Sequence, residues 1–460
     1  MVIGGAFALR HDATSVGVRS PAISPLAAQT DRVLITPLEG MRAYELRRLL
    51  TAHGFDVVPD AGADAFTVVR VPDGVTVSAL VARLAREVPV RSIEGDAVVR
   101  AMRDPDDPLY RATQSGYLDV IRASKGWDRS TGTAEVLIAI IDSGIAWDQP
   151  DLHDRIFINP HETGLSAVDA DGNGCIADIV GCNFVSLSTA DPSCGYTMAP
   201  PNWRTADDEG HGTFVAGLAA AAGNNSRGIS GIAWNARILP VKVLDCTATG
   251  RIADAAAGIR YAARMGADVI NVSFGATSDS LVLREAVQEA QARGAIIVAS
   301  TGNESQRSLT YPAAYPGVIS VAASGRLTEQ GVDYRSLASF TNFGGVDVMA
   351  PGVGVISTVP ESACGTRGWV CLDGPYASAS GSSFATPIVT GAVALLRARY
   401  PDLSPMLLRA LLLDSRQAGT LSSDPGLLDI GAALERPIYE AEAAGLSRAA
   451  TGDSRGPSDP

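Results

Sequence analysis

Three residue types that together can carry out nucleophilic catalysis occur far apart in this sequence of 460 residues. Asp142 follows the apolar run of residues 136–141 and precedes Ser-Gly, His211 lies between two glycines, and Ser383 lies in Gly-Ser-Ser-Phe-Ala-Thr-Pro. A serine hydroxyl becomes an effective nucleophile when a histidine accepts its proton and a carboxylate holds the imidazole in the correct tautomer. The three residues therefore predict acyl-transfer chemistry if the fold brings them together.

Each of these residues also has an ordinary structural explanation. Asp142 could cap the turn that follows it, His211 could be a structural histidine at a helix start, and Ser383 could be the N-cap of the next helix. The combination of the three settings, in one order along the chain, favours the catalytic interpretation.

The three short runs resemble the motifs of the subtilisin-like (subtilase) serine peptidase family. These runs are Asp-Ser-Gly at 142–144, His-Gly-Thr at 211–213 and Gly-Ser-Ser-Phe-Ala-Thr-Pro at 381–387. Their order is that of subtilisin, and it differs from the orders in chymotrypsin and the α/β-hydrolases. The resemblance covers about residues 107–434, with Ser382 in place of the commoner threonine. It implies a serine endopeptidase that hydrolyses peptide bonds through an acyl-enzyme on the serine.

The resemblance also implies the groups around the triad. Asn303, just past an apolar strand, would be one oxyanion donor, and the backbone N–H of Ser383 the other. The substrate backbone would pair as an added strand with residues 273–275. The implied substrate-binding residues are Ser273, Phe274, Gly275, Ala299, Ser300, Thr301 and Gly302. Because no acidic cluster occurs among them, we expect broad specificity that leans towards apolar side chains.

The elements that must position these residues follow from the pattern after residue 136. Apolar strands alternate with helices expected at 253–265 and 281–292, which predicts the α/β class, with a parallel sheet covered by helices on both faces. Asp142 would then lie at the carboxyl edge of the sheet, where active sites of such folds occur. We expect a helix over 214–222 after His211 and another after Ser383, with Pro387 in its first turn.

The chain before this region has a different organisation. Residues 31–103 show the order strand, helix, strand, strand, helix, strand of a small α+β (ferredoxin-like) domain. The resemblance implies that this domain is a propeptide that assists folding and blocks the cleft until self-cleavage between 99 and 107. We expect a leader or truncated signal at 1–30, the propeptide at 31–103, the catalytic domain at 104–436 and a flexible C-terminal tail at 437–460. Residues 104–108 are acidic and contain prolines, which indicates a linker.

The cysteines indicate where the protein works. None of the six forms a C-x-x-C pair and the sequence has five histidines, which argues against a zinc site. An even number of cysteines in loop-like settings predicts disulfides and an oxidising compartment. Cys364 and Cys371 are the expected pair, and the connectivity of the other four stays open. Residues 2–9 resemble a short export signal. We expect a secreted protein.

The run of residues 169–178 predicts a calcium site. Asp169, Asp171, Asn173 and Asp178 place oxygen-bearing side chains around glycines, and calcium requires six to eight oxygen ligands. The spacing departs from an EF-hand because Val180 stands where the twelfth-position glutamate belongs. An Asx-rich turn is the alternative.

The net charge and the hydropathy pattern argue against a nucleic-acid or membrane partner and against a membrane-spanning segment. A formal net charge of −13 argues against nucleic acid or an anionic membrane as partner. Residues 374–396 are uncharged and long enough to span a bilayer, but their first half is small and polar, which favours a buried helix. We expect a monomer that acts on protein or peptide substrates, with its own propeptide as intramolecular inhibitor.

Competing functions lack support in the sequence. An aspartic peptidase needs a second Asp-Ser-Gly box, and an esterase of the α/β-hydrolase fold needs Gly-x-Ser-x-Gly; neither occurs. The remaining alternative is a catalytically inactive subtilase-like binding scaffold.

Overall fold

The computed structural model describes residues 22–23, 32–58, 65–72, 74–96, 104–162, 168–185, 191–195, 203–366, 368–421 and 424–436. Residues 99–103 of the expected cleavage region lie outside these residues, as do the tail expected at 437–460 and all of the leader except 22–23. Contacts along the chain define two compact units, Met1–Ala101 and Met102–Pro460.

In its described residues, the smaller unit consists of one sheet and two helices. Its elements are β1 (Ala22–Ile23), β2 (Arg32–Pro37), α1 (Ala43–Ala52), β3 (Thr67–Arg70), α2 (Val77–Glu87) and β4 (Val90–Gly95). The strand order is β1-β4-β2-β3, with β1 parallel to β4 and the other pairs antiparallel. Leucines at helical spacing, Leu46 and Leu50, face Val33 and Ile35 of β2 in a common core. The second of the expected strands, at 55–58, is reduced to one bridge, in which Val57 pairs with Val69 of β3.

The larger unit is built on a sheet of eight strands, β5 to β12, beside a separate pair, β13 and β14. The strands are β5 (Leu137–Asp142), β6 (Cys182–Asn183), β7 (Arg237–Lys242), β8 (Val269–Val272), β9 (Ile296–Ser300), β10 (Ile319–Thr328), β11 (Gly331–Leu337), β12 (Val348–Pro351), β13 (Val355–Thr358) and β14 (Tyr376–Ala379). The order is β11-β10-β9-β8-β5-β7-β6, with β12 beside β10, while β13 and β14 form a separate antiparallel pair. All pairs of the main sheet are parallel except β10 with β11, so the predicted parallel sheet is confirmed, with one antiparallel pair at its edge.

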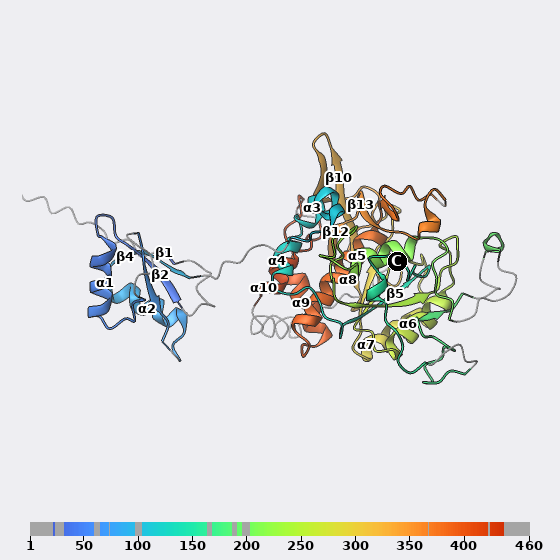
Figure 1. Ribbon diagram of the computed structural model, residues 1–460, viewed down its shortest axis with the longest axis horizontal. Coiled ribbons are helices and arrows are strands. Elements are labelled where there is room, and N and C mark those ends of the chain that lie inside the picture. Colours follow the sequence, from blue (N-terminus) through green and yellow to red (C-terminus); the bar gives the residue numbers. More distant parts are fainter. Residues whose placement is uncertain are drawn as a thin grey trace, which may run out of the picture. The chain divides into compact units, whose positions relative to one another are not determined.

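Helices cover both faces of this sheet. The helices of this unit are α3 (Ser115–Leu118), α4 (Ala123–Trp127), α5 (His211–Ala220), α6 (Ile252–Arg264), α7 (Leu281–Ala292), α8 (Ser382–Arg399), α9 (Pro405–Asp414) and α10 (Ile430–Glu435). Helices α5 and α8 pack on one face of the sheet and α6 and α7 on the other (Figure 1). Side chains alternate along β5, so Ile138 and Ile140 join the core under α5 and α8, whereas Ala139 and Ile141 join the core under α6 and α7. This is the predicted α/β arrangement.

The segment expected to be a linker is part of the larger unit instead. Asp107 is fully buried, and its carboxylate accepts hydrogen bonds from the backbone N–H groups of Asn224 at 2.7 Å and Asn225 at 3.2 Å. Asp106 accepts another from Ser226 N–H at 2.8 Å. The acidic residues that suggested a solvated linker thus anchor the start of this unit to the 224–226 loop.

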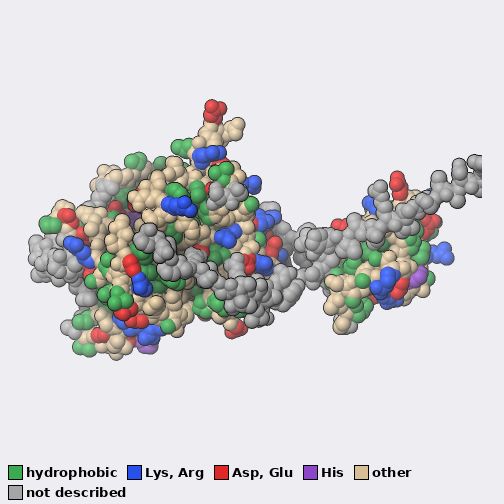
Figure 2. All heavy atoms as spheres, turned by 180° about the vertical axis from the view of Figure 1, so that it is seen from behind, with side chains coloured by type: hydrophobic (Ala, Val, Ile, Leu, Met, Phe, Trp, Pro, Cys, Tyr) green, Lys and Arg blue, Asp and Glu red, His purple; other side chains and the backbone are tan. Residues whose placement is uncertain are grey.

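The charged surface, the disulfides and the character of the helices can be compared with what the composition predicts. Figure 2 shows Lys and Arg side chains interspersed with Asp and Glu on the face of the larger unit that it displays. The predicted disulfide between Cys364 and Cys371 is confirmed, and the other pairs are Cys175 with Cys182 and Cys194 with Cys246. Within the described part of the chain, none of the helices has the length and apolar character needed to cross a membrane. Residues 374–396 contribute β14 and most of the buried helix α8.

Candidate active site

Asp142 is held at the carboxyl end of the central strand β5. Every residue of β5 is buried, and Asp142 is its last residue, with an exposed fraction of 0%. Its Oδ1 lies 2.8 Å from Nδ1 of His211 and also accepts a hydrogen bond from the backbone N–H of Ser143 at 2.8 Å. The carboxylate is therefore fixed in place and oriented towards the imidazole.

The glycines beside His211 permit this approach. Helix α5 begins at His211, three residues earlier than expected, and Gly210 is its N-cap with φ of +121°. A Cβ on Gly212 would lie 2.1 Å from the carbonyl oxygen of Gly144, so only glycine lets the helix start approach the turn after Asp142. The histidine side chain stays 17% exposed, which leaves its ring accessible.

Three carboxylates, those of Asp142, Glu209 and Asp207, favour a positive charge on the His211 imidazole. Glu209 Oε2 accepts a hydrogen bond from the backbone N–H of His211 at 2.6 Å, and Asp207 accepts one from Ser143 Oγ at 2.9 Å. Burial by itself lowers the pKa of His211, but the charge of Asp142, its hydrogen bond to the ring, and the charges of Glu209 and Asp207 raise it more. The net effect raises the pKa from 6.5 to about 9. Burial also raises the pKa of Glu209.

Ser383 lies in the first turn of α8. The helix begins at Ser382, earlier than expected, so Pro387 is inside the helix and not in its first turn. Because proline has no N–H, it cannot donate to the carbonyl of Ser383, four residues earlier. Phe384 packs beside the imidazole, with ring centroids 5.3 Å apart. The serine thus lies at the positive end of the helix dipole.

One cavity brings the separated residues together. A cavity of about 210 Å³ is lined by His211, Ser383 and Asn303, together with residues from the segments after β8 and β9. Its remaining lining residues are Leu244, Ala248, Ser273, Phe274, Gly275, Ser300, Gly302, Glu304, Thr310 and Ser382. The nucleophile candidate, the base candidate and an amide group therefore face the same space.

The Asn303 side chain is oriented by its neighbours. Its Oδ1 accepts a hydrogen bond from the backbone N–H of Ser382 at 2.8 Å. The loop that carries it is tied to Asn342, whose Oδ1 accepts hydrogen bonds from Glu304 N–H and Gln306 N–H, both at 3.0 Å. Asn342 was missed by sequence reasoning because it lies 39 residues away in no recognisable motif.

The expected substrate-binding residues divide into two groups. Ser273, Phe274, Gly275, Ser300 and Gly302 line the cavity. Ala299 and Thr301 are fully buried and are not among the lining residues, since alternate residues along a strand and its extension point to opposite faces.

A second cavity adjoins the first. It has about 240 Å³ and shares Leu244, Ala248, Phe274 and Gly275 with the first cavity. Its other lining residues include the apolar side chains of Val243, Ile252, Ala255, Ala276, Leu283 and Tyr311. Sequence reasoning did not identify the segment at 243–255 as part of the lining of these two cavities.

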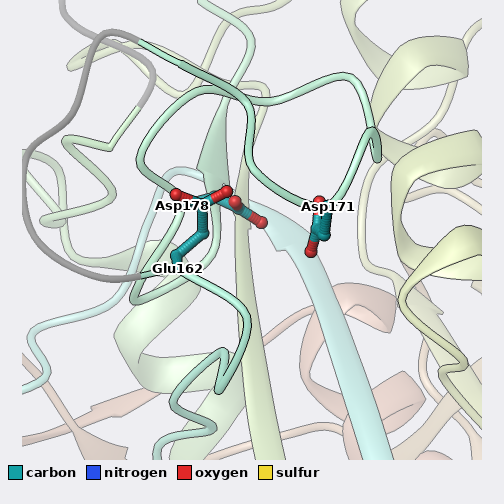
Figure 3. A group of neighbouring side chains, drawn as sticks. All are labelled: Glu162, Asp171 and Asp178. Carbon is teal, nitrogen blue, oxygen red and sulfur yellow. The ribbon is translucent and has the colours of Figure 1, made fainter.

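The expected calcium loop forms a cluster of different composition. Glu162, Asp171 and Asp178 each offer a carboxylate oxygen within 4.8 Å of the others (Figure 3). Glu162 Oε2 and Asp178 Oδ1 are buried and have no hydrogen-bond partner among the described residues. Buried carboxylate oxygens without donors fit a hard cation that prefers oxygen ligands.

Two of the four expected ligands serve other purposes. Asp169 accepts hydrogen bonds from the backbone N–H groups of Gly172, Asn173 and Gly174, which is the Asx-rich turn considered as the alternative. Asn173 accepts from Cys175 N–H and donates to Asp178 Oδ2 at 2.8 Å. Glu162 was missed because it precedes the recognisable loop.

Sequence comparisons identify similar proteins. The subtilase family model (peptidase S8) matches residues 133–430. A thermophilic serine proteinase from Bacillus sp. (strain AK1) is 33% identical over 395 residues, which are 84% of this chain and 84% of that protein. Thermitase from Thermoactinomyces vulgaris is 36% identical over 293 residues, which are 64% of this chain and 85% of that protein.

Solved structures show the same fold. A protease from Pseudoalteromonas arctica has a TM-score of 0.55 and 29% identity, covering 74% of this chain and 100% of that chain. Fervidolysin from Fervidobacterium pennivorans, a keratinolytic enzyme related to subtilisin, has a TM-score of 0.57 and covers 89% of this chain and 62% of that chain. At 24% identity, this second likeness shows the fold alone.

Proposed function

Because this chain belongs to the subtilase family and is a serine-type endopeptidase, we propose that Asp142, His211 and Ser383 are its catalytic triad. The observation that supports the proposal most strongly is the 2.8 Å contact between Asp142 Oδ1 and His211 Nδ1, in a histidine that faces the same cavity as Ser383. An inactive scaffold is not favoured by any feature of this arrangement.

In the proposed reaction, each group has one task. Ser383 Oγ attacks the carbonyl carbon of the scissile peptide bond while His211 Nε2 accepts the hydroxyl proton. Asp142 holds the proton on Nδ1 and stabilises the imidazolium that forms. His211 then donates the proton to the leaving amine, which leaves an acyl-enzyme on Ser383. Water, activated by the same histidine, hydrolyses the ester and restores the serine hydroxyl.

The negative charge of the tetrahedral intermediate requires fixed donors. We assign this role to Asn303 Nδ2 and to the backbone N–H of Ser383. Because Asn303 Oδ1 is already engaged by Ser382 N–H, the amide is oriented before substrate arrives. Such preorganisation is effective because the donors need not reorganise during the reaction.

The two adjoining cavities suggest how substrate is chosen. Residues 273–275 would pair with substrate main chain, which carries little sequence information. The adjoining cavity is lined largely by apolar side chains, so it favours an apolar substrate residue. A peptide-library cleavage profile tests this, and a strict preference for charged residues in the pockets would contradict it.

Kinetics of matched variants test the triad. Ser383→Ala and His211→Ala should each lower kcat on an unfolded protein substrate by at least about 10⁴-fold while leaving the folded state intact. Trp203→Ala, at a residue 42% exposed that does not line the cavity, is the control. Full activity in Ser383→Ala would exclude the proposed role of that serine.

We further propose that the enzyme is a secreted monomer made as a self-cleaving zymogen, with residues 31–103 as the inhibitory propeptide. The three disulfides are consistent with an oxidising compartment. Expressed alone, the wild-type chain should shorten at a bond between 99 and 107, whereas Ser383→Ala should keep its full size. Maturation of the serine variant to the same product would refute self-cleavage.

We propose that Glu162, Asp171 and Asp178 hold a structural calcium ion. Three carboxylates supply part of the required oxygen ligands, and backbone carbonyls and water would complete the shell. When bound, calcium supplies charge neutralisation that stabilises the fold, and it takes no part in the reaction. Calorimetry on the full chain tests the site, because calcium should release or absorb heat with wild type and not with Glu162→Gln.

A further inference from the structure

A disulfide-closed loop packs against the segment that carries His211. The loop connects β13 to β14, and the disulfide joins Cys364 to Cys371 within it. Trp369 lies inside this ring, where its backbone N–H donates to the carbonyl of Thr366 and its own carbonyl accepts from Gly365 N–H, both at 2.9 Å. The main chain at Trp369 is therefore fixed by one covalent link and two hydrogen bonds.

The indole of Trp369 faces the start of helix α5. Its Nε1–H donates to the backbone carbonyl of Glu209 at 3.0 Å, two residues before His211. Its ring stacks on Phe214 with centroids 5.2 Å apart and approaches Phe384 edge-on at 6.5 Å. Phe384 in turn packs on the imidazole of His211. One side chain thus contacts both the backbone and the ring neighbours of the histidine.

The backbone beside His211 leaves space that the indole fills. Gly210 has φ of +121°, and a Cβ built on it would lie 2.5 Å from Trp369 Nε1. Strand β13 adds two bonds to the same helix turn, from Ser357 Oγ to the carbonyl of Phe214 at 2.7 Å and from Thr358 Oγ1 to that of Thr213 at 2.8 Å. Strand β13 and the loop that follows it therefore hold the first turn of α5 through hydrogen bonds and packing.

We propose that Trp369 is a positioning residue for His211, and that the Cys364–Cys371 disulfide keeps its indole in place. The inference rests on the proposed role of His211 as general base. Without the indole, the 209–211 segment loses its hydrogen bond and its packing partner, and the imidazole loses its alignment with Ser383. Misplacement of a catalytic group by about 1 Å costs on the order of 10² in rate.

Four variants of the full chain separate the contributions. Trp369→Ala removes ring and donor and should lower kcat by about 10²-fold with KM nearly unchanged. Trp369→Phe keeps ring packing and should recover most of that loss. The double variant C364S/C371S should fall between them. Val370→Ala, in the same loop at a residue 74% exposed, is the matched control and should behave as wild type.

Two measurements show whether the effect acts through the histidine. Steady-state kinetics on a peptide amide give kcat and KM, and the rate of phosphonylation of the serine by a fluorophosphonate reports its activation without a peptide in the cleft. We expect phosphonylation to slow in Trp369→Ala in parallel with kcat. Thermal unfolding of each variant identifies losses that come from instability.

The outcomes distinguish this inference from the proposed triad. If wild type is neither active nor phosphonylated, the proposed function fails. If wild type is active but Trp369→Ala is phosphonylated at the wild-type rate and loses activity only on peptides, then Trp369 contacts the bound substrate and the inference is wrong. If Trp369→Ala does not fold, Trp369→Phe decides: a phosphonylation rate modestly below that of wild type supports the inference, and a rate equal to that of wild type overturns it.

Discussion

Replacement of Asn303 by leucine removes one donor from the proposed oxyanion hole. The Oδ1 atom is held by Ser382 N–H at 2.8 Å, which leaves Nδ2 as the atom available to an oxyanion in the cavity. The loss of one such donor raises the barrier by about 2.7 to 4 kcal/mol, or 10² to 10³ in kcat. The backbone N–H of Ser383 remains, so residual activity should persist. Because the donor acts on charge that develops in the transition state, KM should change by no more than about threefold.

The assay is steady-state hydrolysis of a chromogenic peptide amide by mature enzyme. Asn303→Asp is an informative companion, since its carboxylate can still accept from Ser382 N–H but presents a negative oxygen where the amide donor was. It should be slower than Asn303→Leu. Gln330→Leu removes an exposed amide from the β10–β11 hairpin and serves as control. A rise in KM with unchanged kcat in Asn303→Leu would refute the reasoning, because it would indicate a ground-state contact.

Three further outcomes are expected. His211 must be neutral to accept a proton, and its raised pKa moves the acid limb of the activity profile above pH 6.5, towards about 9. Glu209→Gln should shift that limb to lower pH, and an unmoved limb would contradict the role of Glu209. A calcium chelator should lower the melting temperature of wild type, since a ligand at 100 times its Kd stabilises by about 2.7 kcal/mol; an equal effect on Glu162→Gln would contradict the site. Asp107→Ala should lower the free energy of urea unfolding by about 1 to 3 kcal/mol because two amides of the 224–226 loop lose their acceptor; an unchanged midpoint would contradict the anchoring.

Sequence patterns predicted the architecture well where the pattern is local. Helix α7 begins and ends at the expected residues, and the wholly apolar run before Asp142 is a buried central strand. Helix starts were less accurate, because α5 and α8 include the small residues of the motifs themselves. Glycine and serine are weak helix formers, and tertiary packing of these segments overrides their propensity.

What the sequence could not predict depends on contacts between distant segments. Glu162 lies beside Asp178 although the two are separated in the sequence, and Asn342, from beyond β11, binds the loop that carries Asn303. Trp369 belongs to no motif, and its contact with Glu209 joins residues 160 positions apart. The acidic run at 104–108 was wrongly interpreted as a linker, because the backbone N–H groups that bind the buried carboxylate of Asp107 come from a distant loop that the sequence does not place beside it.

The most direct test is to identify the residue that a fluorophosphonate modifies. The mature wild-type protein, and the two variants after an added protease has removed residues 31–103, are treated with the reagent, digested and analysed by mass spectrometry. We predict one phosphonylated residue, Ser383, with labelling strongly slowed in His211→Ala and absent in Ser383→Ala. An active enzyme that carries the adduct at another residue, or remains active and unlabelled, would contradict the assignment of Ser383 as nucleophile.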